Sequence, residues 1–375
     1  MSSQRADAAL VDIEDVRAGV DELLAAHVTQ LRTLLAAVSA DADALGDAVE
    51  SMLSGGKRLR AAFCYWSWRS HGGRPGTPEA DAVLRVGAAL ELFQAAALFH
   101  DDVMDDSDTR RGLPAAHRVF ARRHAEHGLR GSAQRFGDSA AILLGDLTLV
   151  ASEQEFATAL ATMPTPRAAR ARAVFDLMRS EVTIGQYLDV LAQAMPWGDD
   201  PSSDEVRARE VIRAKSARYS VEHPIVLGAA LADAGEDELA ACRRIGLPLG
   251  EAYQLRDDLL GVFGDPRTTG KPAGDDLREG KRTVLVARAL ARAVEQDDDE
   301  TASLLRTRLG DRGLSAADAA AVADAIARTG AVDEVERLIE DLAGEAFTLA
   351  EARHWPAPAG DVLTSLAHAA VDRRA

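Results

Sequence analysis

Cysteine is almost missing from this chain of 375 residues. The two that occur, Cys64 and Cys242, are too few for a disulfide framework and lack the spacing of a metal site. No stretch of about 18 residues is uninterruptedly apolar, which predicts no transmembrane segment. The N-terminal residues are polar and acidic and lack the basic start and apolar core of a secretion signal. We therefore expect a protein of the reducing cytoplasm.

Positive charge is also scarce. The chain has 43 basic and 60 acidic residues, which gives a net charge of −17. Proteins that bind nucleic acid usually carry a basic face, so this balance predicts no nucleic-acid partner. Lysine is rare even among the basic residues, and it occurs only at Lys57, Lys215, Lys271 and Lys281. A chain that otherwise uses arginine keeps lysine where a compact, flexible point charge is needed, although chance is the alternative explanation.

Strand alternation with hairpin turns is absent as well. Alanine, leucine and arginine dominate, and apolar residues recur every three or four positions, which predicts helices nearly everywhere. The expected breaks fall at residues 71–78, 126–138, 196–204, 264–281 and 296–301. We predict an all-α fold, a single domain over residues 1–375 with a core of mostly antiparallel helices, in which about the first 15 residues are flexible.

What the chain does contain is two aspartate clusters, each directly after an apolar helical stretch. The first places five aspartates within residues 101–108. On a helix, Asp101 and Asp105 lie on one face, as do Asp102 and Asp106. Such like-charge pairs destabilise a helix unless a hard cation such as Mg²⁺ lies between them. A solvated acidic helix end is the alternative, but the nearly uncharged residues before the cluster favour a metal site.

The second cluster, Asp257-Asp258, repeats this arrangement before a loop rich in glycine and charge at residues 264–281. If the two aspartate pairs face each other across a cavity, several Mg²⁺ ions can clamp one diphosphate between them. Arg110 and Arg111 follow the first cluster closely, and guanidinium groups bind phosphate oxygens in pairs. Charge balancing is the alternative explanation for these two arginines.

Taken together, these residues resemble the trans-isoprenyl diphosphate synthases, or polyprenyl synthetases, over residues 53–288. Gly55-Gly56-Lys57-Arg58-Leu59-Arg60 is similar to the family's basic motif for the isopentenyl diphosphate headgroup, although Ala61 replaces the usual proline. Asp101 to Asp105 resembles the first aspartate-rich motif in its short form. Gln94 falls where the family has a Gln or His that contacts isopentenyl diphosphate.

Further motifs follow in the family's order. Gly185-Gln186 and Lys215-Ser216 resemble its Gly-Gln and Lys-Thr motifs, with serine in place of threonine. Gln254 followed by Asp257-Asp258 resembles the second aspartate-rich motif. The loop that closes over the allylic diphosphate is matched by Lys271, Asp275 and Lys281.

The resemblance implies an isoprenoid synthase fold around a central hydrophobic cavity, and a homodimer. It implies Mg²⁺-dependent head-to-tail (1′-4) condensation of isopentenyl diphosphate with an allylic diphosphate, with the released diphosphate as proton acceptor. The metal set, expected to hold about three Mg²⁺ ions, is Asp101, Asp102, Asp105, Asp257 and Asp258. The substrate-binding set is Lys57, Arg58, Arg60, Gln94, Arg110, Arg111, Gln186, Lys215, Lys271 and Lys281. The catalytic set is Asp101, Asp105, Asp257, Lys215, Ser216 and Gln254.

Ala96, Ala97 and Phe93, which precede the first aspartate-rich motif, bear on the length of the product. In this family an aromatic residue five positions before that motif often floors the product tunnel, but here Ala96 and Ala97 are both small. Phe93 lies one helical turn deeper, about 4.5 Å or one prenyl unit away. These residues predict growth past fifteen carbons to a geranylgeranyl (C20) product or a longer one.

Two other functions compete with this interpretation. A class I terpene cyclase also uses an aspartate-rich helix and Mg²⁺, but it normally carries an Asn/Ser/Glu metal motif and lacks a Gly-Gly-Lys-Arg segment. A non-catalytic regulatory subunit of a prenyl synthase is hinted at by Gly261, which stands where a third aspartate is usual. Asp265 lies one turn further on, and the sequence leaves open whether it substitutes. A plain acidic helical scaffold would require the motif set to be coincidence.

Overall fold

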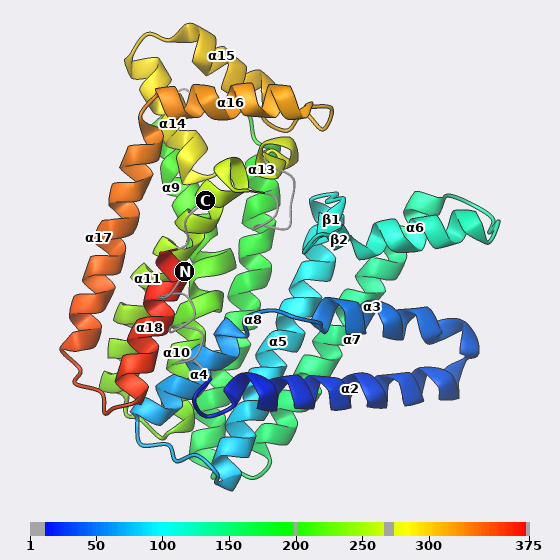
Figure 1. Cartoon of the computed structure of the whole chain (residues 1–375), viewed down its shortest axis with the longest axis vertical. Helices are drawn as coiled ribbons and strands as arrows, with labels where there is room; N and C mark the ends of the chain where they lie inside the picture. The colour runs from blue at the N-terminus through cyan, green and yellow to red at the C-terminus, as the bar shows by residue number, and fades with distance from the viewer. Residues whose placement is uncertain (1–11, 199–200, 266–273, 373–375) are drawn as a thin grey trace.

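The computed structural model describes residues 12–198, 201–265 and 274–372. The helices are α2 (Val16–Val38), η1 (Ala40–Ala42), α3 (Asp43–Leu53), α4 (Leu59–Ser70), α5 (Pro78–Met104), α6 (Ala116–Glu126), α7 (Ala133–Leu160), α8 (Thr165–Ala194), α9 (Pro201–Val211), η2 (Ile212–Glu222), α10 (His223–Leu231), α11 (Glu236–Phe263), α13 (Asp275–Glu279), α14 (Val284–Glu295), α15 (Asp299–Arg308), α16 (Ala316–Arg328), α17 (Ala331–Glu351) and α18 (Ala359–Val371). The predicted all-α bundle is confirmed (Figure 1).

Helix α5 runs through the middle of the molecule and carries the first aspartate cluster at its C-terminal end (Figure 1). The hydroxyl of Thr77 caps its N-terminus by accepting from the Ala80 N–H, and Pro78 stands in the first turn, where no N–H partner is needed. Most of its residues are buried on all sides, as expected of a core helix. Among the described helices, it alone is long and apolar enough to cross a bilayer, and 72 % of that apolar stretch is buried inside the protein.

Two hydrophobic clusters hold the helices around α5. The larger joins α4, α5, α8, α10, α11, α14, α17 and α18. The smaller lies where α2 and α3 cross the bundle, and it includes Leu24, Leu31, Leu92 and Phe99 (Figure 1). Burying each such side chain stabilises the fold by about 1.5–3 kcal/mol, so α5 is held on both sides.

The segment η2 places one of the motif lysines. It continues α9 without a break and leads directly into α10, but its backbone is π-helical. Such wide turns are rare and often occur at functional sites. Gly185 of α8 faces it, because a Cβ there would lie 2.7 Å from the Lys215 Cα. The missing side chain therefore lets α8 approach η2 at Lys215.

The C-terminal helices complete the structure on the side of α11. Helix α14 packs on α9, α17 packs on α11, and α18 packs on α4. Helices α15 and α16 lie at the end of the molecule beside α13, near the aspartate end of α11 (Figure 1). The site thus lies where the central helices meet the segment that follows α11.

Sequence reasoning missed some local features. β1 (Thr109–Arg110) and β2 (Leu113–Pro114) form a short antiparallel hairpin directly after the first aspartate cluster. The break expected at residues 126–138 is shorter, because Ser132 already caps α7 by accepting from the Arg135 N–H. The segment expected to be flexible at the N-terminus falls largely in residues 1–11, outside the described residues.

Candidate active site

A cavity of about 300 Å³ lies between α5, α8, η2 and α11. It brings together most of the residues that the motifs single out. Its lining includes Arg60, Gln94, Ala97, Asp101, Arg110, Gln186, Asp189, Lys215, Ser216, Tyr219, Gln254, Asp257, Asp258 and Lys281. Residues from α4, α5, α8, η2 and α11 therefore converge on one site, as the two-cluster interpretation requires.

Asp101 is paired with Lys215 in this cavity. The Lys215 Nζ donates to Asp101 Oδ1 at 2.8 Å and to Asp189 Oδ2 at 2.6 Å. Gln186 Nε2 donates to the same Asp101 oxygen at 3.1 Å. Burial disfavours the charged carboxylate, but the charges of Lys215, Lys281 and Arg110 outweigh it and hold the pKa of Asp101 well below its ordinary value. Asp101 is therefore ionised at neutral pH.

Asp102 faces a different partner. The hairpin that follows α5 carries Arg110, whose Nε donates to Asp102 Oδ1 at 2.8 Å. Its Nη2 donates to Asp101 Oδ2 at 3.4 Å and also contacts Asp102 Oδ1. Arg110 thus bridges both aspartates and neutralises charge that α5 alone would leave uncompensated.

Asp105 faces the segment that follows α13. Its Oδ2 lies 3.2 Å from Lys281 Nζ, which also lies 2.9 Å from Glu279 Oε2. Glu279 is itself buried and accepts from Ser107 Oγ at 2.6 Å. Burial raises the pKa of Asp105 despite the nearby Lys281 charge. Lys281 is therefore ion-paired with carboxylates from two separate segments, Asp105 and Glu279.

Asp258 presents a buried oxygen without a hydrogen bond. Gln254 Nε2 donates to its Oδ1 at 2.8 Å, but Oδ2 has no hydrogen-bond partner among the described residues. Burial raises the pKa of Asp258 to about 8, against the hydrogen bond from Gln254, and the charges of Asp276 and Asp257 add to the rise. In the absence of a cation this carboxyl is protonated at neutral pH.

The unsatisfied oxygens fit Mg²⁺. Among the described residues, Asp105 Oδ1 and Asp258 Oδ2 are buried without a hydrogen bond, whereas Asp105 Oδ2 is ion-paired with Lys281 at 3.2 Å. A buried carboxylate oxygen can only accept, so such atoms require a proton or a cation. Hard oxygen ligands of this kind suit Mg²⁺. Within the described residues, no three His, Cys, Asp or Glu side chains already converge as a metal cage, because lysines and Arg110 stand between the carboxylates.

Comparison with known proteins decides the family. The model of the family "Polyprenyl synthetase" matches residues 42–324. The chain belongs to the polyprenyl synthetase family. The predicted family, the predicted fold and the predicted enzyme class, a prenyltransferase, are thereby confirmed.

Individual relatives agree with that assignment. The geranylgeranyl diphosphate synthase of Mycobacterium tuberculosis is 33 % identical over 298 residues, which cover 77 % of this chain and 75 % of the relative. The geranylfarnesyl diphosphate synthase of Aeropyrum pernix is 32 % identical over 255 residues, or 66 % and 70 % of the two chains. A crystal structure of the geranylgeranyl pyrophosphate synthase from Corynebacterium glutamicum, complexed with isoprenyl diphosphate and magnesium, superposes with a TM-score of 0.89 at 36 % identity, covering 97 % of this chain and all of that one.

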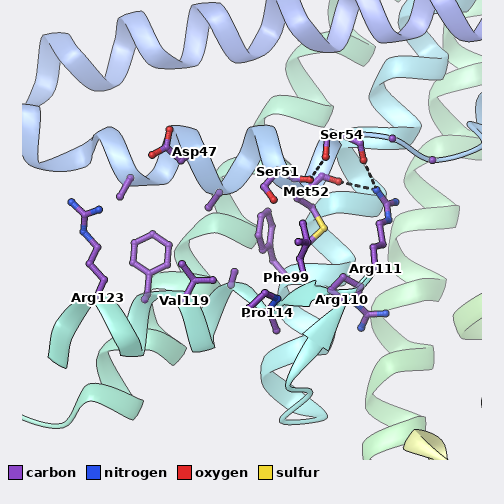
Figure 2. A pocket seen from close by; sticks show the side chains of 18 residues that line it. Asp47, Ser51, Met52, Ser54, Phe99, Arg110, Arg111, Pro114, Val119 and Arg123 are labelled. Atoms are coloured by element: carbon purple, nitrogen blue, oxygen red, sulfur yellow. Dashed lines mark hydrogen bonds between the residues drawn. The ribbon is translucent and has the colours of Figure 1, made fainter. Parts of the chain in front are cut away.

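The residues expected to bind isopentenyl diphosphate in this polyprenyl synthetase are divided between two cavities. Arg60 and Gln94 line the inner one, where the Arg60 guanidinium stacks 4.1 Å from the centroid of the Tyr219 ring. Arg111 instead lines an outer pocket of about 560 Å³ between α3, the hairpin and α6 (Figure 2). Its Nη1 donates to the carbonyls of Met52 and Ser54 at 3.1 and 3.2 Å. Arg110 lines both cavities, so it marks the wall between them.

Three more residues belong to the predicted substrate-binding set, namely Arg58, Lys57 and Lys271. Arg58 does not line either cavity, because its guanidinium is 5 % exposed and is engaged by Asp21 at 2.7 Å, Glu91 at 3.3 Å and the Leu53 carbonyl at 2.6 Å. In this structure Arg58 therefore anchors the start of α4, and its substrate-binding role stays a prediction. Lys57 is exposed on the neighbouring turn. Lys271 lies outside the described residues.

The residues expected to set product length occupy neighbouring faces of α5. Ala97 lines the inner cavity, whereas Ala96 is buried in the core behind it. Phe93 is also buried, and its ring meets Tyr219 edge-on with centroids 5.5 Å apart. Phe93 thus lies behind a ring that lines the cavity, and not on the cavity wall itself. His100 does not line the cavity, and its Nε2 lies 3.1 Å from the Ile142 carbonyl oxygen.

Some site residues escaped sequence reasoning. Asp189, the second partner of Lys215, lies one helical turn after Gln186, and that spacing was a usable signal. Tyr219 stands one turn beyond Lys215 and supports Arg60. Glu279 stands two residues before Lys281, but nothing in the sequence indicates that Glu279 and Asp105 share the Lys281 ammonium.

Proposed function

We propose that this chain condenses isopentenyl diphosphate with an allylic diphosphate, head to tail, and releases a geranylgeranyl or longer all-trans polyprenyl diphosphate. The observation that carries the proposal is the convergence of Asp101, Asp257 and Asp258 on one cavity with Lys215 and Lys281. Carboxylates that can hold a metal ion, together with flexible lysine ammonium groups, suit the stabilisation of a diphosphate leaving group.

Asp101, Asp105 and Asp257 are the residues that would hold Mg²⁺, with Asp102 and Asp258 beside them. When bound, the metal supplies positive charge that stabilises the departing diphosphate. We propose that these five aspartates hold about three ions per site. A magnesium complex of the Corynebacterium relative supports this assignment.

The chain's own lysines complete the charge balance. Lys215 and Lys281 neutralise aspartates in this structure, through ion pairs at 2.8 and 3.2 Å. A flexible ammonium can turn from a carboxylate to a phosphate oxygen, so both are placed to stabilise the charge that develops as the allylic C–O bond breaks. We propose Lys271 as a third such residue on the grounds of its motif.

The acceptor substrate is assigned to the basic side of the site. We place the isopentenyl diphosphate headgroup on Lys57, Arg60, Gln94 and Arg111. Its double bond attacks C1 of the allylic cation and forms the new C–C bond, and a proton then leaves to the released diphosphate. Gln254 and Ser216 line the cavity and can stabilise the cation with their dipoles, while Ala97, Leu98 and Val182 help to exclude water. Gln186 holds Asp101 in place.

We further propose that the chain forms a single domain and works as a homodimer in the cytoplasm. Large apolar side chains are exposed along α7 and α8, among them Leu143 (61 %), Ile184 (57 %) and Tyr187 (64 %). Surfaces of this kind commonly pair with a second copy. Cys64 and Cys242 are both buried and free, which fits a reducing compartment.

The test is direct. Purified protein with Mg²⁺ and isopentenyl diphosphate is given dimethylallyl, geranyl or farnesyl diphosphate, and the products are sized by mass spectrometry. We expect an elongated diphosphate of twenty carbons or more that EDTA abolishes. A cyclic hydrocarbon would replace the proposal with a terpene cyclase, and a folded protein without turnover would replace it with a regulatory subunit.

A further inference from the structure

The geometry points to Asp276 as the third carboxylate of the second aspartate cluster, supplied by α13 and not by α11, with Gly261 as the notch that receives it. The inference rests on the proposed function. It assigns Asp276 the role of a positioning residue, which holds Lys281 in place and supports cation binding. It concerns the position at which this chain departs from the family motif.

Gly261 lies one turn after Asp258 on α11, and the space beside it is already filled. A Cβ at position 261 would overlap Oδ2 of Asp276 and lie 2.6 Å from its Cγ. Any side chain there would therefore displace the Asp276 carboxylate or the segment that carries it. The side chain that occupies this place comes from 15 residues further along the chain, and it is a carboxylate.

Asp276 is held so that its carboxylate serves the site. Its backbone carbonyl accepts from the N–H groups of Gly280 and Lys281 at 3.1 and 3.0 Å. Its Oδ1 lies 3.8 Å from Lys281 Nζ. Both ends of Lys281 are thus tied to Asp276, while the same ammonium reaches Asp105 at 3.2 Å. Asp276 therefore connects the notch in α11 to the first aspartate cluster through one lysine.

A second observation points to a cation at this place. Asp258 is 6 % exposed, lines the inner cavity, and has one carboxylate oxygen without a hydrogen bond. Asp276 is close enough to Asp258 for their charges to interact. Among the described residues, Asp105 Oδ1, across the site, is also buried without a hydrogen bond. Carboxylates gathered around unsatisfied acceptor oxygens need positive charge beyond what Lys281 alone supplies.

The experiment moves the carboxylate between the two positions. We compare wild type, Asp276→Asn, Gly261→Asp and the double variant Gly261→Asp/Asp276→Gly. Mg²⁺ binding is measured by isothermal titration calorimetry in the presence of inorganic diphosphate, and melting temperatures are recorded. Asp333→Asn and Gly344→Asp, both at exposed positions of α17 that do not line the inner cavity, are the matched controls.

We expect Asp276→Asn and Gly261→Asp each to weaken Mg²⁺ binding about 10-fold or more, since groups that support metal ligands commonly contribute that much. The double variant should return to within about 3-fold of wild type, because it again has one carboxylate at the notch. If Asp276→Asn fails to fold, Gly261→Ala serves instead, since its methyl group displaces the same carboxylate without removing a charge.

Two results would overturn the inference: wild-type Mg²⁺ binding by Asp276→Asn, or a double variant as weak as Gly261→Asp. Turnover of wild type with isopentenyl and farnesyl diphosphates is measured in parallel. A wild type that binds Mg²⁺ with diphosphate in the expected pattern but forms no product contradicts the proposed function and leaves the role of Asp276 standing.

Discussion

Gly185→Ala is the substitution whose effect follows most directly from the packing of the site. A Cβ at position 185 would lie 2.7 Å from the Lys215 Cα and 2.7 Å from the Ala214 carbonyl carbon. Both are backbone atoms, so no side-chain rotation can relieve the overlap. Either α8 or η2 must shift, and η2 carries the lysine that pairs with Asp101.

We expect large losses of both stability and kcat. Overpacking of this kind costs about 1–3 kcal/mol, and contact with rigid backbone places the estimate near 3 kcal/mol. With about 2.1 cal/mol/K of unfolding entropy per residue, a chain of 375 residues should melt about 4 °C lower. A shift of Lys215 by about 1 Å should lower kcat about 100-fold.

Thermal unfolding and steady-state condensation kinetics at saturating Mg²⁺ measure both effects. Gly344→Ala is the matched control, because nothing lies near that position on the exposed side of α17. The control should gain about 0.5–1 kcal/mol of stability and keep its rate, since alanine favours a helix over glycine. A Gly185→Ala variant as stable and active as wild type would show that the approach of α8 to η2 does not position Lys215.

Three further substitutions test separate parts of the account. In EDTA, the free energy of unfolding of Asp258→Asn relative to wild type should increase between pH 3.8 and about 8, because in that range Asp258 is protonated in the folded wild type but not in the unfolded one. Urea unfolding at several pH values measures this difference, and a difference that decreases with pH would contradict the prediction. Arg58→Ala leaves Glu91 buried without its cation and should lower the free energy of unfolding by about 3 kcal/mol, and a loss below about 1 kcal/mol would show that Arg58 does not anchor α4. Phe93→Ala removes the ring that packs behind Tyr219 and should lengthen the product by about one prenyl unit, which corresponds to about 4.5 Å of tunnel depth. An unchanged product mass would show that Phe93 does not form the floor of the product tunnel.

The aspartate pairs were visible in the sequence because their signal is local. Asp101 and Asp105 repeat at helical spacing after an apolar run, and the same run explains the burial of α5. Lys215 was also visible, since lysine is so rare in this chain. Each of these residues is identified by its near neighbours, without knowledge of the fold.

Partnerships across the fold were not visible. The notch at Gly261 is filled by Asp276, and no local pattern joins the two positions. Arg58 resembles the other basic residues of its motif, and only the fold shows that Asp21 and Glu91 enclose it. The π-helical geometry of η2 likewise depends on tertiary packing, which overrides helix propensity.

The central claim is that the two aspartate clusters act on one diphosphate as a unit, and a double-mutant cycle tests it most directly. Condensation rates are measured for Asp101→Asn, Asp257→Asn and the double variant, with Mg²⁺ titrated to saturation in each. Substitutions of residues that act as a unit have strongly non-additive effects on rate. The condensation rate of the double variant should therefore be no more than about threefold below that of the slower single variant. Losses that multiply would mean that the clusters serve separate sites, and the account would be wrong.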